Sequence, residues 1–217
     1  MDHEARSFSE RRPVKRRERV MAALRRQSVD QPPVINPTSL ATLELMDIAG
    51  ASFPDAHREP EAMARLALAG HANLGYDSVM PVFSIVQESS ALGCRITWGE
   101  RAGWPVAKGH DPAWNGPADI RIPRDWLRHP DIQCVLSAIR TLKGLVGDSA
   151  AVIGKTMGPW TLAYHCFGLE NFLLMSVDDP GMTRRCLSTQ NDNVLFAQSR
   201  NVLLTPSRLG RCKKDSY

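Results

Sequence analysis

The sequence has few of the features that mark a disulfide scaffold, a membrane protein or a nucleotide-binding domain. Its five cysteines are scattered, odd in number and never spaced as Cys-x-x-Cys, so neither a disulfide framework nor a local metal clip is expected. No run approaches the roughly 20 apolar residues of a membrane span. No Gly-x-Gly-x-x-Gly or Walker motif follows a predicted strand. We therefore expect a cytoplasmic protein with reduced thiols and no membrane partner.

Charge is unevenly distributed along the chain. The formal net charge of +4 comes largely from basic residues at positions 11–26 and 200–214. The first basic segment leads directly into Val20, Ala23 and Leu24 at helical spacing, which favours a solvated face of a surface helix. A patch that binds a polyanion is the alternative. We expect no nucleic-acid partner.

Short apolar runs alternate with helical patterns through most of the chain. Strands are predicted at 32–35, 78–82 and 151–157, with the first and the third of them buried. Helices are predicted at 38–49, 60–74, 83–92 and 132–146, and again after Pro159 and Pro180. A small hairpin excursion is predicted between 94 and 123. This alternation predicts an α/β fold with a parallel sheet.

Four stretches carry a family resemblance. The most specific is residues 154–165, Gly-Lys-Thr-Met-Gly-Pro-Trp-Thr-Leu-Ala-Tyr-His; the others are 33–39, 80–94 and 168–172. Together they resemble the uroporphyrinogen decarboxylase superfamily, and most of all its methylcobalamin:coenzyme M methyltransferase branch. The resemblance runs from about residue 15 to about residue 198, which is the front of the family's barrel only.

The resemblance implies the N-terminal portion of a TIM-type (β/α)8 barrel of the uroporphyrinogen decarboxylase-like kind, truncated after about three strands. We divide the chain into a partial barrel domain, 1–198, and an irregular basic tail, 199–217. We hypothesise that the tail arises from a frameshift or an early stop near residue 199.

The resemblance also implies cofactors and partners. Methyltransferases of this branch take a methyl group from methylcobalamin on a corrinoid protein and pass it to a small thiol, coenzyme M. They activate the thiol with zinc held by a His-x-Cys pair and a distant cysteine in the C-terminal half. Here His165 and Cys166 are adjacent, and His-x-Cys spacing is absent from the sequence. We expect a member of this family that is inactive alone and binds neither cofactor tightly.

Two alternatives remain open. One is a uroporphyrinogen decarboxylase-type carboxy-lyase of porphyrin biosynthesis. Such enzymes carry a pair of arginines after the first strand and an aspartate after the second, and the neighbourhoods 36–40 and 83–85 contain neither. The other is a non-enzymatic fragment, or a subunit that completes a split barrel with a separate C-terminal half.

Chemistry in parallel barrels collects where strands end, so the pocket candidates are the residues that follow the three predicted strands. These are Asn36, Thr38, Phe83, Gln87, Glu88, Met157, Trp160 and Tyr164. Five of them have a simpler interpretation. The first two could form a polar turn, Glu88 could be a solvated carboxylate, and the two aromatic residues of 160–164 could pack the core or a corrinoid. His165 is interpreted as structural, and no metal ligand is predicted.

Overall fold

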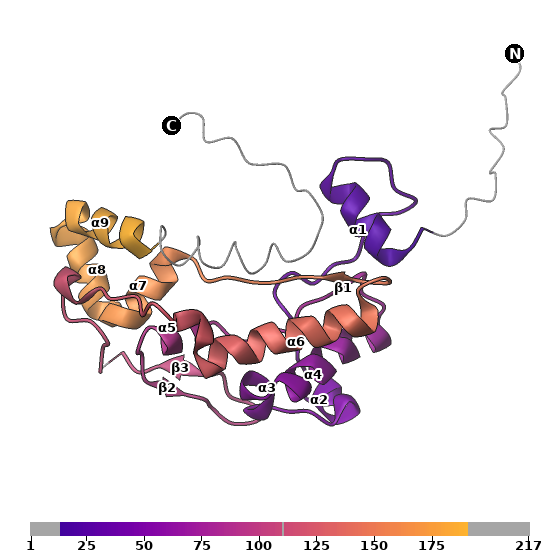
Figure 1. Cartoon of the computed structure of the whole chain (residues 1–217), viewed down its shortest axis with the longest axis horizontal. Coiled ribbons are helices and arrows are strands. Elements are labelled where there is room, and N and C mark those ends of the chain that lie inside the picture. Colours follow the sequence, from indigo (N-terminus) through magenta and orange to yellow (C-terminus); the bar gives the residue numbers. More distant parts are fainter. Residues whose placement is uncertain (1–13, 110, 191–217) are drawn as a thin grey trace, which may run out of the picture.

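The computed structural model describes residues 14–109 and 111–190. Helices dominate, and they surround a small parallel sheet (Figure 1). The elements are α1 (Arg16–Leu24), α2 (Leu43–Ala49), α3 (Asp55–Arg58), α4 (Pro60–Leu74), β1 (Ser78–Val79), α5 (Gln87–Ala91), β2 (Ile96–Thr97), β3 (Val106–Ala107), η1 (Pro117–Asp119), η2 (Trp126–Arg128), α6 (Pro130–Val146), β4 (Ala151–Val152), α7 (Pro159–Phe167), α8 (Leu169–Asp178) and α9 (Pro180–Gln190).

The sheet has the parallel pairing that the sequence predicts. β1 pairs with β4, with Ser78 opposite Ala151 and Val79 opposite Val152. Both strands are shorter than predicted, but the extended chain after β4 continues the ladder, since the Ile153 amide donates to the Val79 carbonyl at 2.8 Å. The predicted hairpin excursion is confirmed by the antiparallel pair of β2 and β3. Later in the same predicted region, residues 119–122 form no strand, and only Asp119 of them belongs to η1.

The predicted first strand is wrong. Residues 32–35 are extended but form no strand, and Val34 and Ile35 are exposed rather than buried. Pro32 and Pro33 have no amide hydrogen to donate, so they cannot continue a ladder. Three bonds still hold the segment beside β1. The Asp77 amide donates to the Val34 carbonyl, the Val34 amide donates to the Asp77 carboxylate, and the Asn36 amide donates to Ser78 Oγ.

The helix ends follow local chemistry that is visible in the sequence. α4 begins with Pro60 at its first position and ends before Gly75, which has φ +72°. α2 begins later than predicted, because the Thr42 side chain caps it by accepting a hydrogen bond from the Leu45 amide. α3 was not predicted, and α5 begins four residues after the predicted start at 83.

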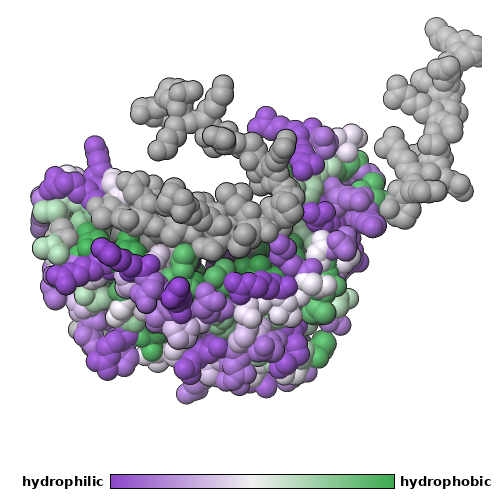
Figure 2. Space-filling model, in the orientation of Figure 1, coloured by the Kyte–Doolittle hydropathy of each residue, from purple (hydrophilic) through white to green (hydrophobic). Residues whose placement is uncertain are grey.

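Two hydrophobic clusters form the interior. The first joins α2, α4 and α6 through residues such as Met63, Leu66 and Leu142. The second joins α7, α8 and the hairpin region through Leu162, Phe167 and Phe172. α7, α8 and α9 gather at the end of the molecule opposite α1 (Figure 1). Figure 2 shows hydrophobic patches along the upper part of a mainly hydrophilic face. Within the described ranges, no helix is long and apolar enough to cross a membrane.

The basic N-terminal segment is not simply a solvated helix face. Arg19 is buried, and its guanidinium bonds Asp30 at 2.8 Å and Asp77 at 3.0 Å. Asp77 stands directly before β1 and also accepts a bond from the Val34 amide at 2.9 Å. The ion cluster of Arg19, Asp30 and Asp77 therefore ties α1 to the beginning of the sheet.

His57 is a titratable residue that packs beside the first hydrophobic cluster. Its ring stacks on Phe53 with centroids 4.0 Å apart, and its side chain is fully buried. Neither ring nitrogen has a hydrogen-bond partner among the described residues. Burial lowers the pKa of His57 from 6.5 to about 4, because the charged form would lose its hydration.

This burial makes stability depend on pH. The unfolded chain binds a proton at His57 below about pH 6.5, whereas the folded chain binds it only near pH 4, so stability falls as pH falls through this window. We expect about 2 kcal/mol to be lost between pH 7 and pH 5. Urea unfolding at both pH values would measure it, and His57→Phe should remove this part of the loss. An equal acid loss in both proteins would contradict the assignment.

Candidate functional site

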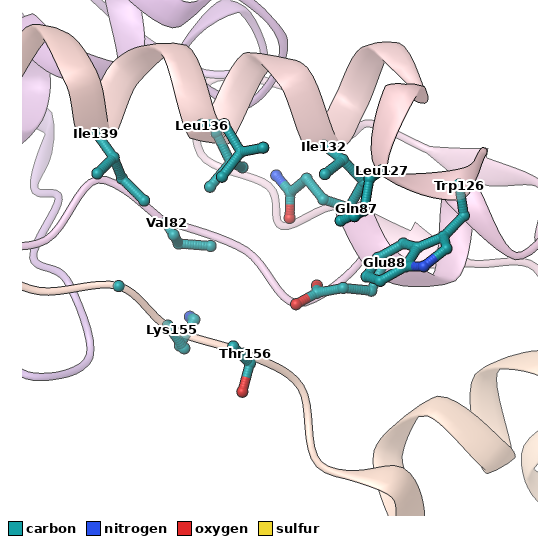
Figure 3. A pocket seen from close by; sticks show the side chains of 12 residues that line it. Val82, Gln87, Glu88, Trp126, Leu127, Ile132, Leu136, Ile139, Lys155 and Thr156 are labelled. Atoms are coloured by element: carbon teal, nitrogen blue, oxygen red, sulfur yellow. The ribbon is translucent and has the colours of Figure 1, made fainter. Parts of the chain in front are cut away.

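A pocket of about 510 Å³, counting the part open to solvent, lies beside the carboxyl ends of β1 and β4. Three elements form it: the chain from β1 into α5, the chain from η2 along α6, and the loop after β4 (Figure 3). Its wall is mostly apolar, with an amide, a carboxylate, an amine and a hydroxyl among its side chains. The lining residues are Val82, Gln87, Glu88, Trp126, Leu127, Ile132, Val135, Leu136, Ile139, Gly154, Lys155 and Thr156.

Glu88 links two sides of the pocket. It stands in the first turn of α5, is only 6% exposed, and its Oε1 accepts a hydrogen bond from the Met157 amide at 3.2 Å. Figure 3 shows its carboxylate directed toward the loop that carries Lys155 and Thr156. The solvated interpretation of Glu88 is therefore wrong, and this carboxylate holds the loop after β4 against α5.

Lys155 supplies the positive charge of the pocket. Burial lowers the pKa of its amine, and the nearby carboxylate of Glu88 acts in the opposite direction. A carboxylate beside an amine in a largely apolar pocket favours the charged form of that amine. The arrangement can bind a small polar or anionic ligand beside an apolar wall.

Gln87 is held in place by its own neighbours. Its side chain is 1% exposed; its Oε1 accepts from Ser84 Oγ at 2.9 Å, and its Nε2 donates to the His57 carbonyl at 3.4 Å. These bonds fix the amide, so Gln87 supports the pocket wall. Phe83 is buried, and its ring centroid lies 5.8 Å from that of Phe53. It does not line the pocket.

Asn36 and Thr38 form a turn. The Asn36 side-chain carbonyl accepts from the Thr38 amide at 3.2 Å and from its hydroxyl at 3.4 Å, and Thr38 is exposed. This is the local bonding that the turn interpretation predicts. Neither residue lines the pocket. A role for them at the mouth of a complete barrel stays a prediction.

The candidates after β4 differ in what they contact. Met157 is buried in the second cluster and touches the site through its amide bond to Glu88. Trp160 is 47% exposed and packs edge-on against Phe172 with centroids 4.8 Å apart. Tyr164 packs edge-on against His165, whose Nδ1 bonds Ser89 Oγ at 2.6 Å. Packing is thus what the structure shows for both aromatic residues.

Sequence reasoning missed several pocket residues. Lys155 and Thr156 lie inside the motif that carries the family resemblance and directly follow a strand, so their position could have indicated them. Trp126 and the apolar side of α6 gave no such indication, because an amphipathic helix pattern does not say what its apolar side covers.

Zinc does not fit the part of the chain that the structure describes. Across residues 14–109 and 111–190, no group of three or more histidine, cysteine, aspartate or glutamate side chains could hold a metal ion. The pocket offers Glu88 alone among these residue types.

Known proteins resemble this chain over most of its length. The family model described as uroporphyrinogen decarboxylase (URO-D) matches residues 15–197. A methylcobamide:CoM methyltransferase, MtaA from Methanosarcina barkeri, is 32% identical over 176 residues, 80% of this chain and 51% of its own length. Another, MtbA from Methanosarcina mazei, is 36% identical over 152 residues, 70% of this chain and 44% of its own.

A solved structure extends the likeness to three dimensions. A methyltransferase from Methanosarcina mazei superposes with a TM-score of 0.81 at 29% identity, over 88% of this chain and 57% of that one. The chain thus spans about half the length of the curated relatives that it matches. The predicted fold class, the N-terminal portion of a TIM-type barrel, is confirmed. The chain belongs to the uroporphyrinogen decarboxylase family.

Proposed function

We propose that the chain is part of a corrinoid-dependent methyltransferase that passes a methyl group from methylcobalamin to a small thiol of the coenzyme M type, and that it is inactive alone. The observation that carries this proposal is the 32–36% identity to methylcobamide:CoM methyltransferases over 70–80% of the chain. A cytoplasmic location, predicted from the sequence, belongs to the same proposal.

The pocket beside β1 and β4 would receive the thiol substrate. Coenzyme M is a short thiol with an anionic sulfonate, and Lys155 offers a partly buried cation for that group. The apolar side of α6 would pack the ethylene carbons, and Glu88 would keep Lys155 charged and in place. Methylcobalamin, when bound, supplies the methyl group that the thiol sulfur accepts.

A separate C-terminal half would supply the remaining part of the barrel. The chain spans about half of each relative above, and the described residues offer zinc no ligand set. We propose that a corrinoid protein, a thiol and this second half are the partners, and that the second half contributes the zinc ligands implied by the family.

Decarboxylation of a porphyrinogen is the weaker alternative. A uroporphyrinogen decarboxylase from Anaeromyxobacter dehalogenans is 29% identical over 160 residues. At the carboxyl ends of the first strand-like segment and β1, however, this chain has Asn36, Thr38 and Phe83. These residues offer no cation for the several carboxylates of such a substrate.

The test is an assay of the full chain, alone and mixed with the C-terminal half of the M. barkeri relative. Methylcobalamin and coenzyme M are supplied, and loss of the methylcobalamin absorbance is followed together with thiol methylation. We expect no turnover by the chain alone and turnover in the mixture. Carbon dioxide release from uroporphyrinogen by the mixture, without methyl transfer, would replace the proposal with the alternative, and turnover by the chain alone would refute its inactivity.

Substituting Lys155 separates the role of the pocket from that of the barrel. We expect Lys155→Met to weaken coenzyme M binding by the mixture about tenfold or more, because a charge-assisted bond contributes roughly 1.5–3 kcal/mol. Lys143→Met, on the exposed side of α6, is the matched control. Titration calorimetry would measure both dissociation constants. Equal affinities would place the thiol elsewhere.

A further inference from the structure

Two cysteines that are distant in the sequence touch each other inside the second cluster. Cys94 lies three residues after α5, and Cys166 lies in the last turn of α7. Their Sγ atoms are 3.5 Å apart, and both side chains are buried. The Cys94 thiol also lies 3.5 Å from the His165 carbonyl oxygen. Both thiols are free.

We propose that Cys94 and Cys166 form a redox-active pair, a site at which a peroxide oxidises the two thiols to a disulfide. A disulfide needs its sulfur atoms about 2.05 Å apart. The two atoms are already in contact, so no group has to leave the space between them. The site lies apart from the pocket, which neither cysteine lines.

The surroundings favour Cys94 as the thiol that reacts first. Its contact with Cys166 lowers the pKa of Cys94, although burial opposes the change. The same contact and burial raise the pKa of Cys166. The thiolate is the nucleophile in such chemistry, so the two cysteines have different roles. Cys94 attacks the oxidant first, and Cys166 then attacks the oxidised Cys94.

The reaction balances with hydrogen peroxide as the oxidant. The Cys94 thiolate attacks one peroxide oxygen, the O–O bond breaks, and a sulfenic acid and hydroxide result. The Cys166 sulfur then attacks the Cys94 sulfur, the S–S bond forms, and the S–O bond breaks. The leaving hydroxide takes the Cys166 proton. Overall, the two thiols lose two electrons and two protons, and the peroxide is reduced to two waters.

The disulfide would join α7 to the segment that follows α5, the helix that carries the pocket residue Glu88. Cys94 follows α5, which carries Glu88, and Cys166 shares α7 with Trp160 and Tyr164. The bond would also close a long loop in the unfolded chain, since the cysteines are 72 residues apart. We expect the oxidised chain to melt roughly 5–10 °C higher than the reduced chain.

Peptide mapping tests the pair directly. The full chain is treated with hydrogen peroxide, its remaining thiols are alkylated in denaturant, and it is digested with trypsin. Each of the five cysteines falls in a different tryptic peptide, and those of Cys94 and Cys166 are 66–95 and 156–184. We expect these two peptides joined, two hydrogens lighter than their sum, and separated again by dithiothreitol. The thiol count should fall from five to three.

Two variants control the assignment. Cys134 belongs to the other cluster, so Cys134→Ser should keep the joined peptides, whereas Cys94→Ser should keep its four thiols under the same treatment. A wild-type chain that retains all five thiols would overturn the proposal, as would a disulfide that joins other peptides. The map of the wild-type chain decides the matter even if Cys94→Ser misfolds.

Discussion

Replacing Arg19 with methionine is expected to lower the free energy of unfolding by roughly 3 kcal/mol. Arg19 holds two carboxylates, with its Nε and Nη2 each 2.8 Å from an oxygen of Asp30 and its Nη1 3.0 Å from Asp77. Methionine keeps the apolar stem but removes the charge. The Asp77 side chain, 4% exposed, would remain buried with its bond from the Val34 amide, and its nearest cation would be Arg16, at 3.9 Å.

Urea unfolding would measure this loss, with Arg25→Met as the matched control. Arg25 is exposed at the end of α1, so its replacement should change stability by no more than about 0.5 kcal/mol. The bonds from Arg19 lower the pKa of Asp30 to about 2. The stabilisation at Asp30 is therefore present above about pH 4 and is lost as pH falls to about 2. Similar losses in both variants would contradict the role of the buried cluster.

Charge patterns along the sequence could not have revealed this cluster. Arg19 and Asp77 are 58 residues apart, and the chain near Arg19 is so rich in arginine that a solvated helix was the simplest interpretation. The helix itself was predictable from Val20, Ala23 and Leu24. Which arginine of α1 is buried depends on where β1 begins, and that position is set by tertiary packing.

Local chemistry explains which elements were predicted well. Pro60 and Gly75 restrict the backbone at the two ends of α4. The predicted bounds of this helix, 60–74, therefore match the observed ones. An apolar run such as 32–35 carries no comparable constraint. Its prolines argue against a strand, and its apolar side chains argue for one. The bonds it makes to Asp77 and Ser78 leave it extended without becoming a strand.

Site residues were predictable where they follow the ends of strands. Gln87 and Glu88 follow β1 and do line the pocket, and Met157 contacts the site through its amide. Trp126 could not be predicted, because the 3-10 turn that carries it lies outside the repeating strand and helix units. Its place in the pocket depends on how η2 and α6 pack against the rest of the chain. The same packing makes α6 one wall of the pocket.

Replacing Phe172 with alanine is expected to cost the most of any change considered, roughly 3–5 kcal/mol. Phe172 is fully buried in α8 and contacts the rings of Trp160 at 4.8 Å and Phe167 at 6.3 Å between centroids. Alanine would leave a cavity between α7 and α8 and remove the surface that positions Trp160. The loss would be measured by urea unfolding of the full chain.

Two controls distinguish packing from helix propensity or general sensitivity. Leu174 is on the same helix but 56% exposed, so Leu174→Ala should cost no more than about 0.5 kcal/mol. Phe172→Leu keeps most of the volume and should cost less than about 1.5 kcal/mol. If Phe172→Ala proved as mild as Leu174→Ala, α8 would not be packed on α7. Trp160 would then lack the packing partner that α8 gives it.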